Sequence, residues 1–150
     1  MAVIDPLQIK DFLVEKVVKN YSGFFDKGTS EILAQIKREK IPRPVIYIGM
    51  GTCGLIAGAD KTFKAVENYL EDNKTDAEVV KVGCLGLCTA EPLMDVQLPG
   101  KSRISFKHAT EDKVEDLLNA VFHHTPIFEN ALGQYRLPIH IEWPGLGYIE

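Results

Sequence analysis

Three cysteines are the residues of this chain with the most evident chemistry. Cys53 stands alone, whereas Cys84 and Cys88 form a C-x3-C pair, with Gly83 and Gly86 beside them. An odd number of cysteines cannot pair completely within one chain, and it does not describe a secreted disulfide scaffold. In a reducing compartment, three clustered thiols predict a metal site.

The glycines beside the cysteines favour iron–sulfur chemistry. Glycine lets the backbone curl tightly and direct amide N–H groups toward a sulfur. Thiolates bound to ferric iron and sulfide carry excess negative charge, which such donors stabilise while raising the reduction potential. Gly49, Gly51 and Gly54 could do the same around Cys53.

Other interpretations of the cysteine pattern stay open. Free thiols are often buried as small hydrophobic groups, without any metal. A structural zinc site needs four ligands and does not usually have C-x3-C spacing, and a redox dithiol needs the C-x-x-C spacing that Cys53 lacks. The segment 49–54 also has the form G-x-G-x-x-G. A dinucleotide site would need an acidic residue at the end of the next strand, and the predicted strand there ends in Val82 without one.

A strand–helix–strand unit is expected to position the cysteines. The short apolar run 45–48 is typical of a buried strand, 57–71 has helical periodicity, and 77–82 predicts a second strand. Cys53 follows the first strand and the C-x3-C pair follows the second. Because the carboxyl ends of neighbouring strands open on the same edge, we expect the three sulfurs to meet at one rim.

The rest of the chain predicts one α/β domain with two arms. Strands at 93–98 and 103–107 form a hairpin and a helix reaches residue 122, giving a mixed four-stranded sheet with flanking helices, of thioredoxin type, over 45–122. Residues 1–44 predict a helical arm. Residues 123–150 predict an extended tail or linker, in which we expect the aromatic residues to face a partner: Tyr135, Trp143 and Tyr148.

Composition narrows the classes of function. The 150 residues include 17 basic and 21 acidic side chains, a formal charge of −4, with 45% hydrophobic residues. This balance is that of a globular domain and argues against nucleic acid as a partner. No apolar stretch approaches the ~20 residues of a membrane span, and Asp5 and Lys10 interrupt the place of a signal peptide. We therefore expect a cytoplasmic protein.

Three segments together resemble a known family. Residues 45–59, residues 83–88 and the run Glu91-Pro92-Leu93 are similar to the thioredoxin-like 2Fe-2S ferredoxin domain, in the version that precedes the flavin- and NADH-binding module of NADH dehydrogenases and NAD-linked, often electron-bifurcating, hydrogenases. The resemblance implies an electron-transfer module with a 2Fe-2S cluster held by Cys53, Cys84 and Cys88. It implies no catalytic residue in the chain alone. Its partners would be the flavin- and NADH-binding module or subunit and other iron–sulfur subunits. Association with further copies of the same chain is also consistent with the resemblance.

The first cysteine loop departs from that family. The family commonly places two cysteines in each loop, whereas this chain has only Cys53 in the first. Thr52, Asp60 and Glu91 stand nearby, but the sequence leaves the fourth ligand unassigned. Three explanations of the missing cysteine stay open: a non-cysteine group completes the site, two chains share their ligands, or the cluster has been lost. In the last case the chain would be a clusterless thioredoxin-like docking domain with a structural role in the same type of complex.

Overall fold

The computed structural model describes residues 6–19, 24–125, 129–136 and 140–149. The chain divides into two compact units, Met1–Pro42 and Arg43–Glu150. Among the described residues, no helix combines the length and apolar character that crossing a membrane requires.

The described residues of the first unit are mainly helical. It contains α1 (Pro6–Phe12), which continues as a π-helical segment (Leu13–Val18), and α2 (Lys27–Ile36). Asp26 caps α2 by accepting a hydrogen bond from the backbone N–H of Thr29 at 2.9 Å.

The second unit is built on a mixed sheet of five strands in its described part, not the four that the sequence predicted. Their order is β2-β1-β3-β4-β5. The strands are β1 (Val45–Gly49), β2 (Glu78–Val82), β3 (Met94–Gln97), β4 (Ile104–Phe106) and β5 (Ala131–Gln134). The additional strand β5 comes from the expected tail and pairs antiparallel with β4. Its sequence ALGQ has no β-branched or aromatic residue, so it carried no strand signal.

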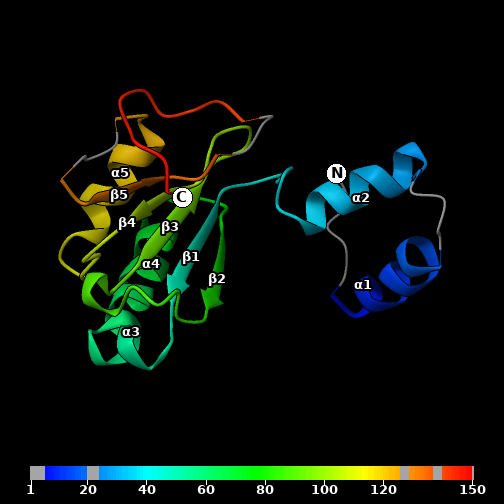
Figure 1. Cartoon of the computed structure of the whole chain (residues 1–150). Coiled ribbons are helices and arrows are strands. Elements are labelled where there is room, and N and C mark those ends of the chain that lie inside the picture. The colour runs from blue at the N-terminus through cyan, green and yellow to red at the C-terminus, as the bar shows by residue number, and fades with distance from the viewer. Residues whose placement is uncertain (1–5, 20–23, 126–128, 137–139, 150) are drawn as a thin grey trace. The chain divides into compact units, whose positions relative to one another are not determined.

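The parallel pair β1 and β2 creates the edge where the cysteines lie. Val45 pairs with Glu78 and Gly49 with Val82, so both strands end at the same level. The short helix α3 (Thr52–Ile56) and the loop after β2 lie at this end of the sheet, where both arrowheads point in Figure 1. We call this end of the sheet the rim.

Two helices cover one face of the sheet and form the core with it. They are α4 (Ala59–Asp72) and α5 (Val114–Phe122), behind the strands in Figure 1. Alternate residues of the strands, such as Ile46, Ile48 and Phe106, are fully buried against them. This alternation is the period-two pattern of a sheet with two different faces.

The opposite face of the sheet carries buried polar side chains. Asp95 is buried and forms an ion pair with Arg103 at 3.5 Å. The Arg103 guanidinium also lies over the rings of Tyr47 and Tyr135, at 5.0 and 4.0 Å from their centroids. Burial raises the pKa of the Asp95 carboxyl, and the Ser105 hydroxyl and the Arg103 charge oppose that rise.

The C-terminal segment is held firmly against the sheet. Trp143 is only 1% exposed, and its indole N–H donates to the Ser102 carbonyl at 2.7 Å. The Gln134 side chain accepts from the Trp143 backbone N–H and donates to the carbonyls of Trp143 and Leu146. The expectation that Trp143 faces a partner is therefore wrong, because this indole fills the chain's own core.

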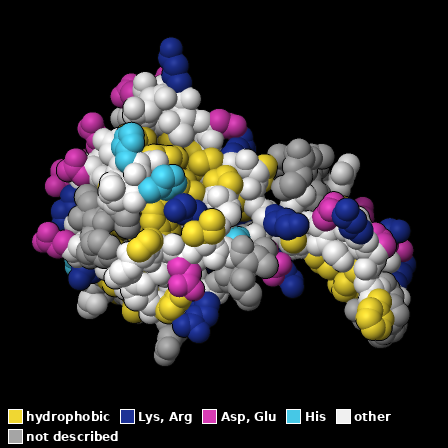
Figure 2. Space-filling model, turned by 90° about the horizontal axis from the view of Figure 1, so that it is seen from above, with side chains coloured by type: hydrophobic (Ala, Val, Ile, Leu, Met, Phe, Trp, Pro, Cys, Tyr) yellow, Lys and Arg dark blue, Asp and Glu magenta, His cyan; other side chains and the backbone are white. Residues whose placement is uncertain are grey.

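Charged side chains are mixed over the surface seen from above. In Figure 2 the Lys and Arg side chains alternate with Asp and Glu on this face, without a region of a single sign.

Candidate metal centre

The structure brings the three cysteine sulfurs together at the rim. Cys53 lies in α3, shortly after β1. Cys84 lies in the loop after β2, and Cys88 begins the short 3-10 helix (Cys88–Ala90) that ends this loop. The Cys53 and Cys88 Sγ atoms are 2.7 Å apart, the Cys84 and Cys88 Sγ atoms 3.7 Å, and all three lie within 4.8 Å of one another. All three thiols are free, and those of Cys84 and Cys88 are exposed.

Close backbone contact between the two loops makes this convergence possible. A Cβ atom on Gly51 would lie 2.9 Å from the Cys84 Cβ and 3.0 Å from its backbone nitrogen. Gly54 is placed as tightly, since a Cβ there would overlap the carbonyl oxygen of Gly49. The glycines of the first loop thus serve mainly to let α3 approach the second loop and the end of β1.

One backbone amide points at a sulfur, as the glycine pattern predicted. The Gly86 N–H donates to the Cys84 Sγ at 3.2 Å, and Gly86 has a φ of 85°, which favours glycine. Donors of this kind stabilise thiolates bound to a metal.

The thiol of Cys88 holds its proton firmly in the absence of a metal. Its hydrogen bond with Cys53, and next that with Cys84, raises the pKa of the Cys88 thiol to about 12. Binding of a metal must therefore release this proton, which is the ordinary requirement for a thiolate ligand.

The sulfur distances fit a metal for one pair of cysteines and need adjustment for the other. Two thiolates on one tetrahedral metal, with metal–sulfur bonds of about 2.3 Å, stand roughly 3.8 Å apart. Cys84 and Cys88, at 3.7 Å, already have this spacing. Cys53 and Cys88, at 2.7 Å, are closer than that and farther apart than a disulfide bond of about 2.05 Å. Cys53 would have to move outward by about 1 Å to bind the same metal ion as this pair, and farther than that to hold the second iron of a binuclear cluster.

A fourth ligand does not join the three sulfurs within the part of the chain that the structure describes. No other histidine, cysteine or acidic side chain there belongs to the group. Thr52 and Asp60 are exposed beside the first loop.

Glu91 is a buried carboxylate beneath the first loop. One of its oxygens accepts from the Leu93 N–H at 2.8 Å, and the other has no hydrogen-bond partner among the residues that the structure describes. The carboxylate lies against Gly49 and Gly54, 3.1–3.3 Å from where their Cβ atoms would be. Sequence reasoning named this residue without foreseeing its burial, which places it under α3 rather than among the sulfurs.

Sequence reasoning missed the exposed apolar side chains that stand next to the cysteines in the two loops. Leu55, Ile56, Leu85 and Leu87 are 46–83% exposed, and we call these four side chains the collar. The signal was available in the sequence, because the segments 49–59 and 82–90 contain no charged residue.

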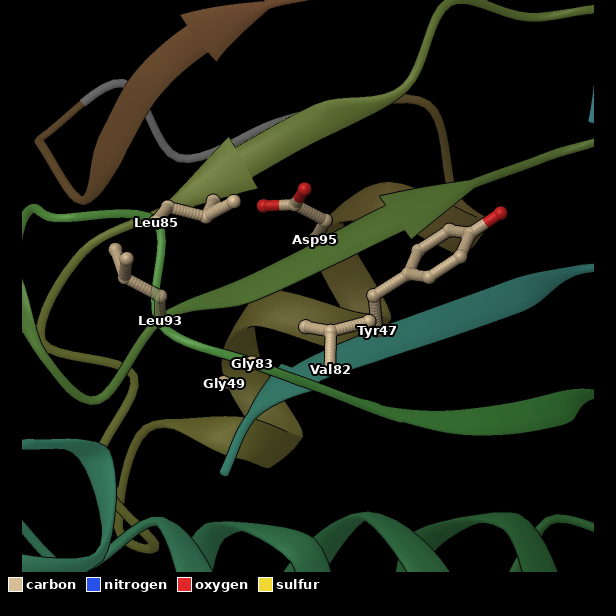
Figure 3. Close-up of a pocket in the computed structure, with 7 residues that line it drawn as sticks. All are labelled: Tyr47, Gly49, Val82, Gly83, Leu85, Leu93 and Asp95. Atoms are coloured by element: carbon tan, nitrogen blue, oxygen red, sulfur yellow. The ribbon is translucent and has the colours of Figure 1, made fainter. Parts of the chain in front are cut away.

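A small cavity lies behind the second loop, on the polar face of the sheet. Leu85, Leu93 and Asp95 are among the residues that line it, and Figure 3 shows the Asp95 carboxylate directed toward Leu85 over β3. Its accessible space is about 10 Å³, room for a single water molecule. This cavity is too small for a substrate.

Comparisons with known proteins bear on the fold of the chain. No protein-family model matches the chain. It is 27% identical over 93 residues to the NADP-reducing hydrogenase subunit HndB of Solidesulfovibrio fructosivorans, an alignment covering 61% of this chain and 74% of that protein.

Solved structures are more distant in sequence but similar in architecture. A thioredoxin-like [2Fe-2S] ferredoxin from Aquifex aeolicus superposes with a TM-score of 0.51 at 13% identity, covering 67% of this chain and all of that one. A structure of the wild-type thioredoxin-like [2Fe-2S] ferredoxin from Aquifex aeolicus superposes with a TM-score of 0.52 at 11% identity, covering 61% of this chain and 98% of that one. The chain thus has the fold of the thioredoxin-like 2Fe-2S ferredoxins, as its sequence resemblance predicted.

Proposed function

We propose that this chain is an electron-transfer module that carries a 2Fe-2S cluster on Cys53, Cys84 and Cys88. The observation that carries the proposal is the meeting of these three sulfurs, from two separate loops, at an exposed rim. The fold, which solved 2Fe-2S ferredoxins share, supports it.

Residues of both loops would bind the cluster. Cys84 and Cys88 have the spacing of two thiolates on one metal, and Cys53 supplies a third thiolate from the opposite loop. The Gly86 N–H stabilises the negative charge on Cys84. When bound, such a cluster takes up and releases one electron at a time.

The complex in which the module works is inferred from its relatives. The aligned HndB protein is named as a subunit of an NADP-reducing hydrogenase. We assign this chain to an oxidoreductase complex of the hydrogenase or NADH dehydrogenase type, beside a flavin- and NADH-binding partner and other iron–sulfur subunits.

Anaerobic reconstitution of the full chain with iron and sulfide tests the proposal. We expect equal amounts of iron and sulfide, about two of each per chain, with visible absorbance and an EPR signal after one-electron reduction. Cys84→Ser and Cys53→Ser should each lower the iron content, whereas Thr89→Ala, at an exposed position beside Cys88, should retain it. Protein without iron or visible absorbance would refute the proposal. One cluster per two chains would assign the ligands to a shared site.

A second candidate function is a docking domain without a cluster. It is favoured by the count of three ligand side chains and by the 2.7 Å between the Cys53 and Cys88 sulfurs, which is shorter than metal ligation allows. The same iron analysis separates the two candidates, because a docking domain would bind its complex while never taking up iron.

A further inference from the structure

The collar is an unusual concentration of exposed apolar surface. Within the described part of residues 43–150, five large hydrophobic side chains are exposed, and four of them are the collar residues. The fifth, Ile141, hydrogen-bonds through its backbone to Gly100, at the opposite end of the sheet from the rim. Clusters of this kind mark surfaces that bind another molecule.

A groove with an acidic wall adjoins the collar. It is open, has a volume of about 440 Å³, and runs between the segment 55–61 and the segment 110–112. Leu55 and Ile56 form its apolar side. Its charged side holds three carboxylates and one ammonium group: Asp60, Glu111, Asp112 and Lys61. Lys61 lies 3.7 Å from Glu111, so the groove as a whole remains negative.

We propose that the collar and this groove are the docking face for a basic redox protein whose own electron-transfer centre is surrounded by apolar side chains. The proposal rests on the proposed function, because the rim is where an electron would leave the chain. The uncharged collar would exclude water between the two centres, and the groove would orient the partner through its Lys or Arg side chains.

The charges of the groove favour a basic partner over a second copy of this chain. A two-fold contact between copies places the same patch on both sides of the interface. It would bring two acidic grooves into one interface, where like charges repel. An acidic carrier protein would meet the same repulsion.

Ferric cytochrome c is a suitable probe, because it is basic and has an exposed haem edge within an apolar surface. In the assay, one electron passes from the reduced chain to the ferric haem, which becomes ferrous, and no proton is transferred. The double variant Ile56→Ser/Leu85→Ser should lower the second-order rate constant about tenfold. The variant Asp60→Asn/Glu111→Gln should lower it about fivefold at low salt and little at high salt.

Matched controls carry the same substitutions away from the rim. Ile141→Ser removes an exposed apolar side chain at the far end of the sheet, and Glu71→Gln removes an exposed carboxylate near the end of α4. Both should react at the wild-type rate. Equal losses in the collar and control variants would overturn the proposal. So would an acidic haem protein, cytochrome b5, reacting as fast as cytochrome c.

Amide chemical-shift mapping with cytochrome c tests docking without depending on a cluster. We expect the largest shifts in the segments 52–61, 83–89 and 110–112 of the full chain. Shifts elsewhere, or none, would overturn the docking proposal. Because iron content is measured separately, a chain that holds no iron would refute the proposed function while the shift map still decides whether this face binds.

Discussion

Replacing Gly51 with alanine should weaken metal binding more than it weakens the fold. The new Cβ would stand 2.9 Å from the Cys84 Cβ, where ordinary contacts begin at 3.4 Å. The second loop must therefore retreat by about 0.5 Å, and overpacking of this kind costs roughly 1–3 kcal/mol. Because the segment 83–89 is exposed throughout, the metal-free chain relieves this strain by moving the loop. The cost then falls on metal binding, as a loss of about 5- to 150-fold in affinity.

Cobalt(II) titration measures this effect, because thiolate-to-cobalt absorption bands report sulfur ligation. Gly83→Ala is the matched control, since a Cβ there meets nothing within 4 Å. We expect Gly51→Ala to bind cobalt more weakly than the wild type and to melt within a few degrees of it. Gly83→Ala should have the cobalt affinity and the melting temperature of the wild type. Equal cobalt affinity for the two variants would refute the argument that the loop contact positions Cys84.

Three further outcomes are expected. Trp143→Phe should lower the free energy of unfolding by about 1–3 kcal/mol in chemical denaturation, since the Ser102 carbonyl loses its buried donor; an unchanged midpoint would contradict the role of this indole. The pKa of Asp95 is raised above its ordinary value of 3.8, so the folded chain binds this proton more tightly than the unfolded chain, and the free energy of unfolding should fall as the pH rises from 3.8 through the pKa of the folded state. Asp95→Asn should flatten that part of the curve of stability against pH, and an unchanged curve would refute this assignment. A fragment of residues 45–122 should lack cooperative melting whereas 43–150 should retain it, because the shorter piece loses β5 and Trp143; cooperative melting of both would show that the tail is dispensable.

The part of the site that sequence reasoning predicted depends on local patterns and one general rule. The apolar run before Cys53 and the strand before Cys84 are visible in the sequence, and parallel strands end at one edge. These two facts suffice to bring the sulfurs of Cys53, Cys84 and Cys88 together, as the structure has them.

The features that sequence reasoning missed depend on tertiary contacts. β5 is a strand only because β4 offers it a partner, and its own residues favour no strand. Trp143 is buried because Gln134, on that same strand, holds its backbone. A proline- and glycine-rich segment gives no sign of such contacts, so it was expected to be an extended tail.

The contact of Gly51 with Cys84 also sets how long any bound metal would stay. Cys53 and the C-x3-C pair belong to two loops whose backbones touch at this contact, which we call the seam. When the two loops separate there, Cys53 moves away from the other two ligands in a single event. The rate at which a chelator removes metal should then reach a ceiling as chelator concentration rises. That limiting rate equals the rate at which the two loops separate, so it measures the motion of the rim.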